Sequence, residues 1–155
     1  MTGKADEHRY LRSLGAADVV GRDALEDDSG RVLGTARFAG AVDCVGGSML
    51  ASILRVLRWG GAVAVTGLVA GAALETTVYP FLTRNVAMLG IDSVDAPDEV
   101  RRAVWETLAC ALPAEVTERL VAREVGLDGI SAGLAELDRG AVRGRILVDP
   151  QRSAG

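Results

Sequence analysis

Cysteine and histidine are almost absent from this sequence. The 155 residues include two cysteines, Cys44 and Cys110, and one histidine, His8. Two cysteines make no disulfide framework, and without a Cys-x-x-Cys pair the chain offers no zinc constellation. We therefore expect two reduced structural thiols, Cys44 in a buried strand and Cys110 in a helix, and a solvated His8. No metal site is predicted.

Long apolar runs and basic clusters are lacking as well. No apolar run reaches the roughly 18 residues of a membrane span, and the N-terminus has no apolar signal-peptide core. We therefore predict a cytoplasmic protein with no membrane partner. The net charge is -4, and the 17 lysines and arginines are spread along the chain, which disfavours nucleic acid as a partner. A hydrophobic content of 49% can supply the core of one domain.

Residues 41–71 carry the clearest pattern in the chain. Two apolar runs, over 41–45 and 62–66, flank a segment with helical periodicity over 48–58. Both runs are apolar throughout and do not alternate, which is typical of parallel strands covered on both faces. The pattern predicts a strand, a helix and a second strand parallel to the first.

A glycine follows each apolar run, Gly46 the first and Gly67 the second. Glycine permits a tight turn and lets a ligand approach the backbone at the carboxyl edge, where open α/β sheets bind ligands. Loop formation alone explains either glycine equally well. The loop over 67–80 is longer than a turn requires, so it is a candidate functional loop.

The other segments continue the alternation of strands and helices. A helix is predicted to begin after Lys4 and to end at Gly15. A short helix is possible around Leu25, Val32 and Leu33. Trp105 is expected to pack against other side chains of the protein. We predict further strands over 18–20, 86–91, 122–125 and 146–148, a helical turn over 80–85, and helices over 98–111, 115–120 and 131–138. This order indicates an α/β fold with a doubly wound parallel sheet.

A hydroxyl and two cations occur where a dinucleotide fold selects its cofactor. Thr2, Gly3 and Lys4 precede the first helix, and Arg22 follows the run over 18–20. In dinucleotide folds a carboxylate after the second strand holds a ribose 2′-hydroxyl, whereas a cation accommodates a 2′-phosphate. Here no carboxylate stands at that position, and a cation, Lys4, is present instead. Taken alone, Thr-Gly-Lys is a common surface tripeptide.

Several motifs in a fixed order resemble one family. They are T-G-K from Thr2, H-x-Y-L-x-S-L-G-A from His8, V-x-x-R-D from Val19, A-V-D-C-V-G-G from Ala41, G-G-x-V-A-V-T-G-L-V-A-G from Gly60, P-F-L-x-R-N-V-x-x-L-G-I-D-S-V from Pro80 and R-G-R-I-L-V from Arg143. The order resembles the C-terminal half of the acryloyl-CoA reductases, also described as quinone oxidoreductases, of the zinc-independent medium-chain dehydrogenase/reductase superfamily. The segment over 80–94 is the most distinctive part.

The resemblance implies an NADPH-dependent reductase of the carbon–carbon double bond in an acryloyl-CoA-like enoyl thioester, or of a quinone. Thr2, Gly3 and Lys4 stand where the family binds the 2′-phosphate with Ser-Gly-Arg, and Arg22 matches the arginine at the same phosphate end. By the same resemblance, Leu68, Leu82 and Ser93 line the nicotinamide side, and Arg139 stands where the family has a polar cofactor contact. The cofactor supplies the hydride, so we nominate no catalytic residue.

The chain departs from the family at its start. No G-x-G-x-x-G or Gly-Gly-Val-Gly element precedes Ala41, and the family's GroES-like catalytic domain and first Rossmann strand have no counterpart. We therefore expect residues 1–155 to form a truncated NADP-binding Rossmann domain, with a partial doubly wound sheet that lacks its first strand. Residues 121–149 include strands expected to pack on the absent catalytic domain, and such a fragment is expected to be inactive alone.

Two other function classes stay open at this point. An S-adenosylmethionine-dependent methyltransferase also has strand-Asp-x-x-Gly followed by helix, Gly-Gly and strand, although it usually has proline where Trp59 stands. A noncatalytic interaction fragment could use exposed sheet edges to bind a partner or itself. The expected partners are a small enoyl-CoA or quinone substrate, and either a second copy of the chain or the missing N-terminal half.

Overall fold

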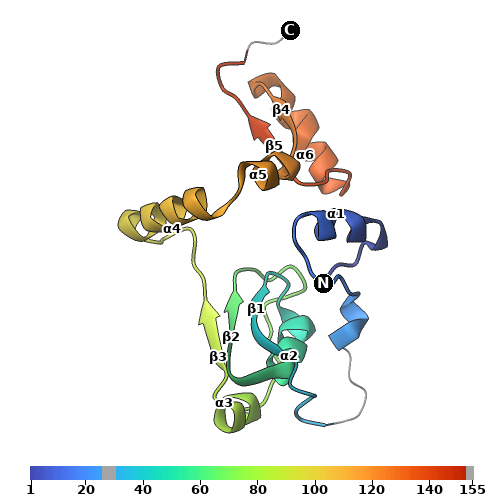
Figure 1. Cartoon of the computed structure of the whole chain (residues 1–155), viewed down its shortest axis with the longest axis vertical. Helices are drawn as coiled ribbons and strands as arrows, with labels where there is room; N and C mark the ends of the chain where they lie inside the picture. Colours follow the sequence, from blue (N-terminus) through green and yellow to red (C-terminus); the bar gives the residue numbers. More distant parts are fainter. Residues whose placement is uncertain (26–30, 153–155) are drawn as a thin grey trace. The chain divides into compact units, whose positions relative to one another are not determined.

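The computed structural model describes residues 1–25 and 31–152, which divide into two compact units, Met1–Asp98 and Glu99–Gly155 (Figure 1). No helix within the described residues is long and apolar enough to cross a membrane.

The first unit contains a three-stranded parallel sheet, as the apolar runs predict. Its strands are β1 (Phe38–Asp43), β2 (Leu57–Val65) and β3 (Ala87–Gly90), in the order β1-β2-β3. Helix α2 (Gly47–Val56) connects the first two strands, and α3 (Tyr79–Arg84) precedes the third. Because all three strands run in the same direction, their carboxyl ends meet at one edge of the sheet (Figure 1).

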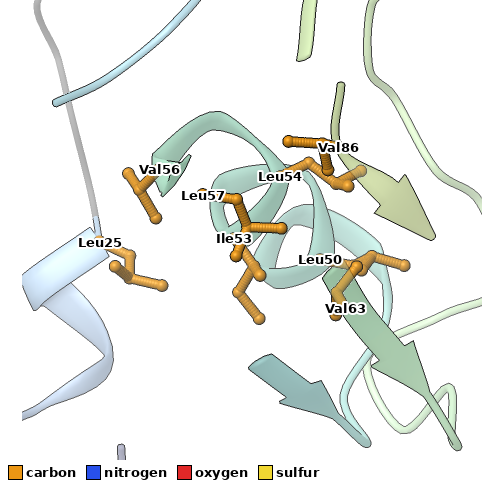
Figure 2. Packing of buried hydrophobic residues seen from close by; sticks show 8 residues of the cluster. All are labelled: Leu25, Leu50, Ile53, Leu54, Val56, Leu57, Val63 and Val86. Carbon is orange, nitrogen blue, oxygen red and sulfur yellow. The ribbon is translucent and has the colours of Figure 1, made fainter. Parts of the chain in front are cut away.

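The core of this unit lies between α2 and one face of the sheet. Figure 2 shows the α2 side chains facing Val63 of β2 and Val86 beside β3. Leu54, Leu57 and Val63 have no exposed surface. The helical spacing over 48–58 predicted that Leu54 and Leu57 point inward. Because α2 ends at Val56, Leu57 contributes to the core from the first position of β2.

Within this unit α2 covers one face of the sheet, and the other face exposes apolar side chains. Val42, Ala64 and Leu89 are register partners on that second face. Val42 is 76% exposed and Leu89 is 51% exposed. We predicted a sheet covered on both faces, and within the described part of this unit only one face is covered.

Two predicted boundaries of the sheet were wrong. The first strand ends at Asp43, not at residue 45, because the residues after it form a tight turn. The second strand begins at Leu57 and runs through Gly60 and Gly61, whereas the apolar run predicted a start at residue 62. The register shifts between Phe38 and Gly40, so the two glycines accommodate an irregularity in the ladder and do not end the strand.

The N-terminal segment is helical, as predicted, but it contributes no strand. A 3-10 helix (Ala5–Glu7) leads into α1 (His8–Ser13), and Gly15 takes a positive φ of 104°. The strand predicted over 18–20 is wrong: the segment is not assigned as a strand, and its Val20 carbonyl accepts a hydrogen bond from the Thr2 N–H at 3.1 Å. Neither sheet of the described structure includes this segment.

The segment after Val20 contributes one side chain to the core of the first unit. Residues Arg22–Leu25 form a 3-10 helix, and Leu25 is 4% exposed in the cluster with α2. Part of the short helix expected around Leu25, Val32 and Leu33 lies outside the described residues, and the part from Arg31 onward is not helical.

The second unit combines three α-helices with a two-stranded parallel sheet among its described residues. Its strands β4 (Val121–Val125) and β5 (Arg145–Val148) pair with each other, a partnership that the sequence did not predict. The helices are α4 (Asp98–Ala111), α5 (Ala114–Leu120) and α6 (Ile130–Asp138), with a 3-10 turn at Leu127–Gly129. Packing of these strands on a further domain stays a prediction.

Helix α4 has its predicted bounds but not its predicted burial. Its apolar stripe includes Val100 and Val104, which are 50% and 52% exposed, and Trp105 is 66% exposed. The expected packing of Trp105 is therefore wrong within the described structure. Periodicity placed the stripe on one face of the helix, but a stripe is buried only where another element covers it.

Candidate functional site

A buried carboxylate shapes the turn after β1. Asp43 is 2% exposed, and its Oδ2 accepts a hydrogen bond from the Gly46 N–H at 2.8 Å. Its Oδ1 accepts a second from the Val45 N–H at 3.2 Å. A buried carboxylate is costly unless it is hydrogen-bonded, and here both oxygens are satisfied by the turn itself. Asp43 therefore ends the strand and fixes the path of residues 43–47, which we call the dividing loop.

The dividing loop is locked to the loop that follows β2. The Thr66 N–H donates to the Asp43 carbonyl at 2.8 Å, and the Ala70 N–H donates to the Val45 carbonyl at 2.7 Å. A Cβ atom on Gly67 would lie 2.7 Å from the Cys44 carbonyl oxygen. This contact requires glycine at 67, so the glycine that the sequence placed after the second strand serves close packing of two loops.

One hollow lies beside β1, on the first side of the dividing loop. This β1 hollow has a volume of about 470 Å³, and its lining includes Thr2, Gly3, Lys4 and Arg22 together with Asp43. The Lys4 N–H donates to Thr2 Oγ1 at 3.1 Å, and a Cβ on Gly3 would lie 3.5 Å from Arg22 Cζ. The structure thus brings together the four residues predicted for the 2′-phosphate end.

The β1 hollow also corrects the placement of Cys44. This residue lines the hollow and is exposed, whereas the sequence pattern predicted a thiol buried in a strand. The strand ends one residue earlier, at Asp43, so Cys44 belongs to the turn. Cys110 is exposed too, and both are free cysteines.

A second hollow lies on the other side of the dividing loop, at the ends of β2 and β3. This β3 hollow has a volume of about 640 Å³ and includes Gly46, Gly67, Leu68, Asp92 and Ser93 in its lining. Its exposed lining is mainly apolar. The structure therefore brings Leu68 and Ser93 together, as the prediction of a nicotinamide side requires.

The other two predicted cofactor residues are not brought to these hollows. Leu82 lies on α3, which precedes β3 and so stands at the opposite end of the strand from Ser93 (Figure 1). It is 78% exposed and lines neither hollow. Arg139 belongs to the second unit, where it is the C-cap of α6. The cofactor roles of both residues stay predictions.

Two aspartates at the strand ends were not among the predicted site residues. Asp43 holds the dividing loop, and Asp92 lines the β3 hollow, where its Oδ1 accepts hydrogen bonds from the Val94 N–H at 2.8 Å and the Asp95 N–H at 3.2 Å. A signal was available, because each aspartate follows an apolar run at a carboxyl end. Aspartate in such a place commonly accepts hydrogen bonds from nearby backbone N–H groups.

We expect the Asp92 carboxyl to titrate below its ordinary pKa. The N–H of Val94, and then that of Asp95, donates to the ionised form and lowers the pKa. A lowered pKa means that the contribution of Asp92 to stability is present above its unfolded pKa and is lost as the pH falls through the folded pKa. Carboxyl NMR titration measures this directly. A pKa at or above the ordinary aspartate value of 3.8 would contradict it.

The described residues contain no group of three or more histidine, cysteine, aspartate or glutamate side chains that could hold a metal ion. In residues 1–25 and 31–98, one hollow has a hydroxyl and two cations with Asp43 in its lining, and the other has mainly apolar groups with Asp92 and Ser93. Such groups are suited to binding and orienting a ligand. A phosphate group suits the first hollow, because Lys4 and Arg22 offer charged donors next to the Thr2 hydroxyl.

Comparison with known proteins identifies the family. Residues 1–109 match the family described as zinc-binding dehydrogenase. The chain is 41% identical over 147 residues to the putative quinone oxidoreductase YhfP of Bacillus subtilis, covering 95% of this chain and 44% of the relative. It is 42% identical over 149 residues to the acrylyl-CoA reductase AcuI of Ruegeria pomeroyi, covering 96% and 45%.

Solved structures agree with this assignment. The crystal structure of Escherichia coli K-12 YhdH with bound NADPH superposes with a TM-score of 0.85 at 37% identity, over 95% of this chain and 45% of that chain. The structure of Bacillus subtilis YhfP with bound NAD gives a TM-score of 0.88 at 40% identity, over 95% and 45%. The chain thus spans about half the length of the relatives that it matches. These findings confirm the family that the motifs indicated: the chain belongs to the zinc-binding dehydrogenase family and corresponds to the C-terminal, cofactor-binding half of a medium-chain dehydrogenase/reductase.

Proposed function

We propose that this chain is the cofactor-binding portion of an NADPH-dependent oxidoreductase that reduces the carbon–carbon double bond of acryloyl-CoA, a similar enoyl thioester, or a quinone. The observation that carries the proposal is the pair of hollows on the two sides of the dividing loop. One is lined by Thr2, Lys4 and Arg22, and the other by Leu68 and Ser93. A dinucleotide has two chemically different ends that call for such a pair.

Each hollow has the chemistry that its end of NADPH requires. In the β1 hollow, Lys4 and Arg22 offer charged donors to the 2′-phosphate, and the Thr2 hydroxyl and the flexible Gly3 backbone lie beside them. In the β3 hollow, Leu68 and the neighbouring small residues exclude water around the nicotinamide, while Ser93 offers a polar contact. Leu82 and Arg139 remain nominated by family resemblance.

The chemistry of reduction belongs to the bound cofactor, which supplies the hydride. The residues of this chain bind the dinucleotide, orient it and exclude water from its reactive end. The names of the relatives support acryloyl-CoA and quinones as substrates, and the dehydrogenase family favours a reductase over a methyltransferase. The two solved structures contain NADPH and NAD respectively, so the preference for NADPH rests on Lys4 and Arg22 of this chain.

The double substitution of Lys4 and Arg22 by alanine tests the cofactor assignment. We expect NADPH to bind at least about 100-fold more weakly, because each of the two charged donors contributes about 1.5–3 kcal/mol through a hydrogen bond. NADH lacks the 2′-phosphate, so its affinity is expected to change little. Calorimetric titration of the 155-residue chain gives both affinities.

Arg58→Ala serves as the matched control, because Arg58 is exposed and lines neither hollow. Equal weakening of NADPH and NADH by the double substitution would contradict the phosphate assignment. The wild-type chain is also titrated after mixing with the remaining, N-terminal portion of the Ruegeria relative. Absence of saturable NADPH binding in both preparations would reject the proposed function.

A further inference from the structure

The dividing loop depends on Asp43, which stands out as the buried charged side chain among the described residues. Its two carboxylate oxygens accept the Val45 and Gly46 N–H groups, and its carbonyl accepts the Thr66 N–H. One residue therefore ties together the end of β1, the turn into α2 and the end of β2. Removing the charge weakens the two attachments that the carboxylate makes, while the main-chain carbonyl of residue 43 can still accept the Thr66 N–H.

The N-terminus of α2 relies on this carboxylate for its position. The N-cap residue of α2 is Gly46, which has φ 73° and no side chain that could accept a hydrogen bond. Asp43, three residues earlier, instead holds the N-cap residue itself by accepting the Gly46 N–H at 2.8 Å. A glycine turn has many accessible conformations, so the carboxylate is what selects one of them.

The two sides of this turn belong to different hollows. Asp43 and Val45 line the β1 hollow, whereas Gly46 and Gly47 line the β3 hollow. The hydrogen bond between Asp43 and Gly46 therefore joins residues that line different hollows. The position of the dividing loop sets the distance between the two hollows.

From this placement we infer that Asp43 is a positioning residue that couples the two hollows, so that both ends of one dinucleotide are held at the same time. The inference rests on the proposed function. Two linked ligand halves bind more tightly than either half only where the geometry allows both to engage together. Asp43 acts through the dividing loop, and the gain in affinity comes from the fixed spacing.

The test compares a whole dinucleotide with its halves. The affinities of NADPH, adenosine 2′,5′-bisphosphate and reduced nicotinamide mononucleotide are measured for the wild-type chain and for Asp43→Asn, alone and with the N-terminal portion of the Ruegeria relative. Asparagine keeps the size of the side chain but offers one acceptor oxygen where the carboxylate offers two. We expect NADPH to bind about tenfold or more weakly to the variant, while each half changes by less than about threefold.

Asp18→Asn is the matched control. The Asp18 carboxylate also accepts a backbone N–H, that of Val19 at 2.8 Å, but it is exposed and lines neither hollow. The control is expected to leave the affinity for NADPH unchanged. Asp43→Ser is the second variant if the asparagine variant does not fold, because its hydroxyl can still accept one of the two N–H groups.

The possible results distinguish a failure of the Asp43 inference from a failure of the proposed function. If the wild type binds NADPH and Asp43→Asn binds it equally well, the inference is wrong and the proposed function stands. A loss of affinity for one half as large as the loss for NADPH also overturns the inference, since Asp43 would then act on one hollow alone. If the wild type binds no NADPH in either preparation, the proposed function fails and the inference with it.

Discussion

Replacing Gly46 with alanine is expected to destabilise the first unit by about 3 kcal/mol or more. The new Cβ atom would both strain the backbone and overlap neighbouring atoms. Gly46 has φ 73° and ψ -161°, a conformation that residues with a Cβ rarely adopt. The new Cβ would also lie 2.7 Å from the Gly71 carbonyl oxygen and 3.1 Å from Leu68 Cα. Both neighbours are backbone atoms and cannot rotate away. Urea unfolding followed by circular dichroism measures the loss.

Gly60 provides the control for backbone strain alone. It has a φ of 70°, similar to that of Gly46, but a Cβ built on it meets nothing within 4 Å. Gly60→Ala is therefore expected to cost about 1–2 kcal/mol, the penalty of a left-handed backbone for a residue with a Cβ. Equal losses at the two positions would show that the contact with the 67–71 loop is unimportant for stability.

Replacing Arg84 with methionine is expected to cost about 2–4 kcal/mol, because carbonyl groups inside the unit lose a charged donor. The Arg84 guanidinium is partly buried and donates from Nη1 to the carbonyls of Arg55 and Leu57, at 2.9 and 3.2 Å. Its Nη2 donates to the Gly34 carbonyl at 2.7 Å. Methionine fills similar space but cannot donate, so the end of α2 and the segment before β1 lose a shared attachment.

The same substitution at Arg58 separates the loss of these bonds from the general effect of removing an arginine. Arg58 is exposed on β2, and Arg58→Met is expected to change the free energy of unfolding by less than about 0.5 kcal/mol. Arg84→Lys is expected to recover part of the stability, since lysine keeps the charge without the planar fork. A neutral effect of Arg84→Met in urea unfolding would contradict the structural role of this side chain.

Arg84 also explains what the most distinctive motif of the chain does. In the segment over 80–94, Pro80 occupies the first turn of α3, Arg84 makes the three hydrogen bonds, and Asn85 takes the left-handed conformation at the C-cap with φ 49°. These positions build and attach a helix. The segment that best identified the family therefore includes residues that stabilise the fold, together with Ser93 at the proposed cofactor end.

Local pattern was sufficient for most of the helices and strands, and family resemblance added part of the site. The periodic leucines of α2 predicted a helix with an apolar face, because periodicity is a property of neighbouring residues in sequence. The grouping of Thr2, Gly3, Lys4 and Arg22 was predicted from family resemblance and from their chemistry, and the structure places these residues around one hollow. By contrast, the strand over 18–20 was wrong, since a strand requires a neighbouring strand that local sequence does not reveal.

By itself, the sequence determined the family, the alternation of strands and helices, the parallel sheet, and the set of cations and small residues near the strand ends. Only the tertiary structure decided that β2 runs through Gly60, that Leu82 stands away from both hollows, and that Asp43 joins two loops. The physical reason is the range of the forces involved. Helical periodicity and turn chemistry act between residues close in sequence, whereas ladder pairing, burial of a carboxylate and glycine-to-carbonyl contacts depend on which distant segments meet.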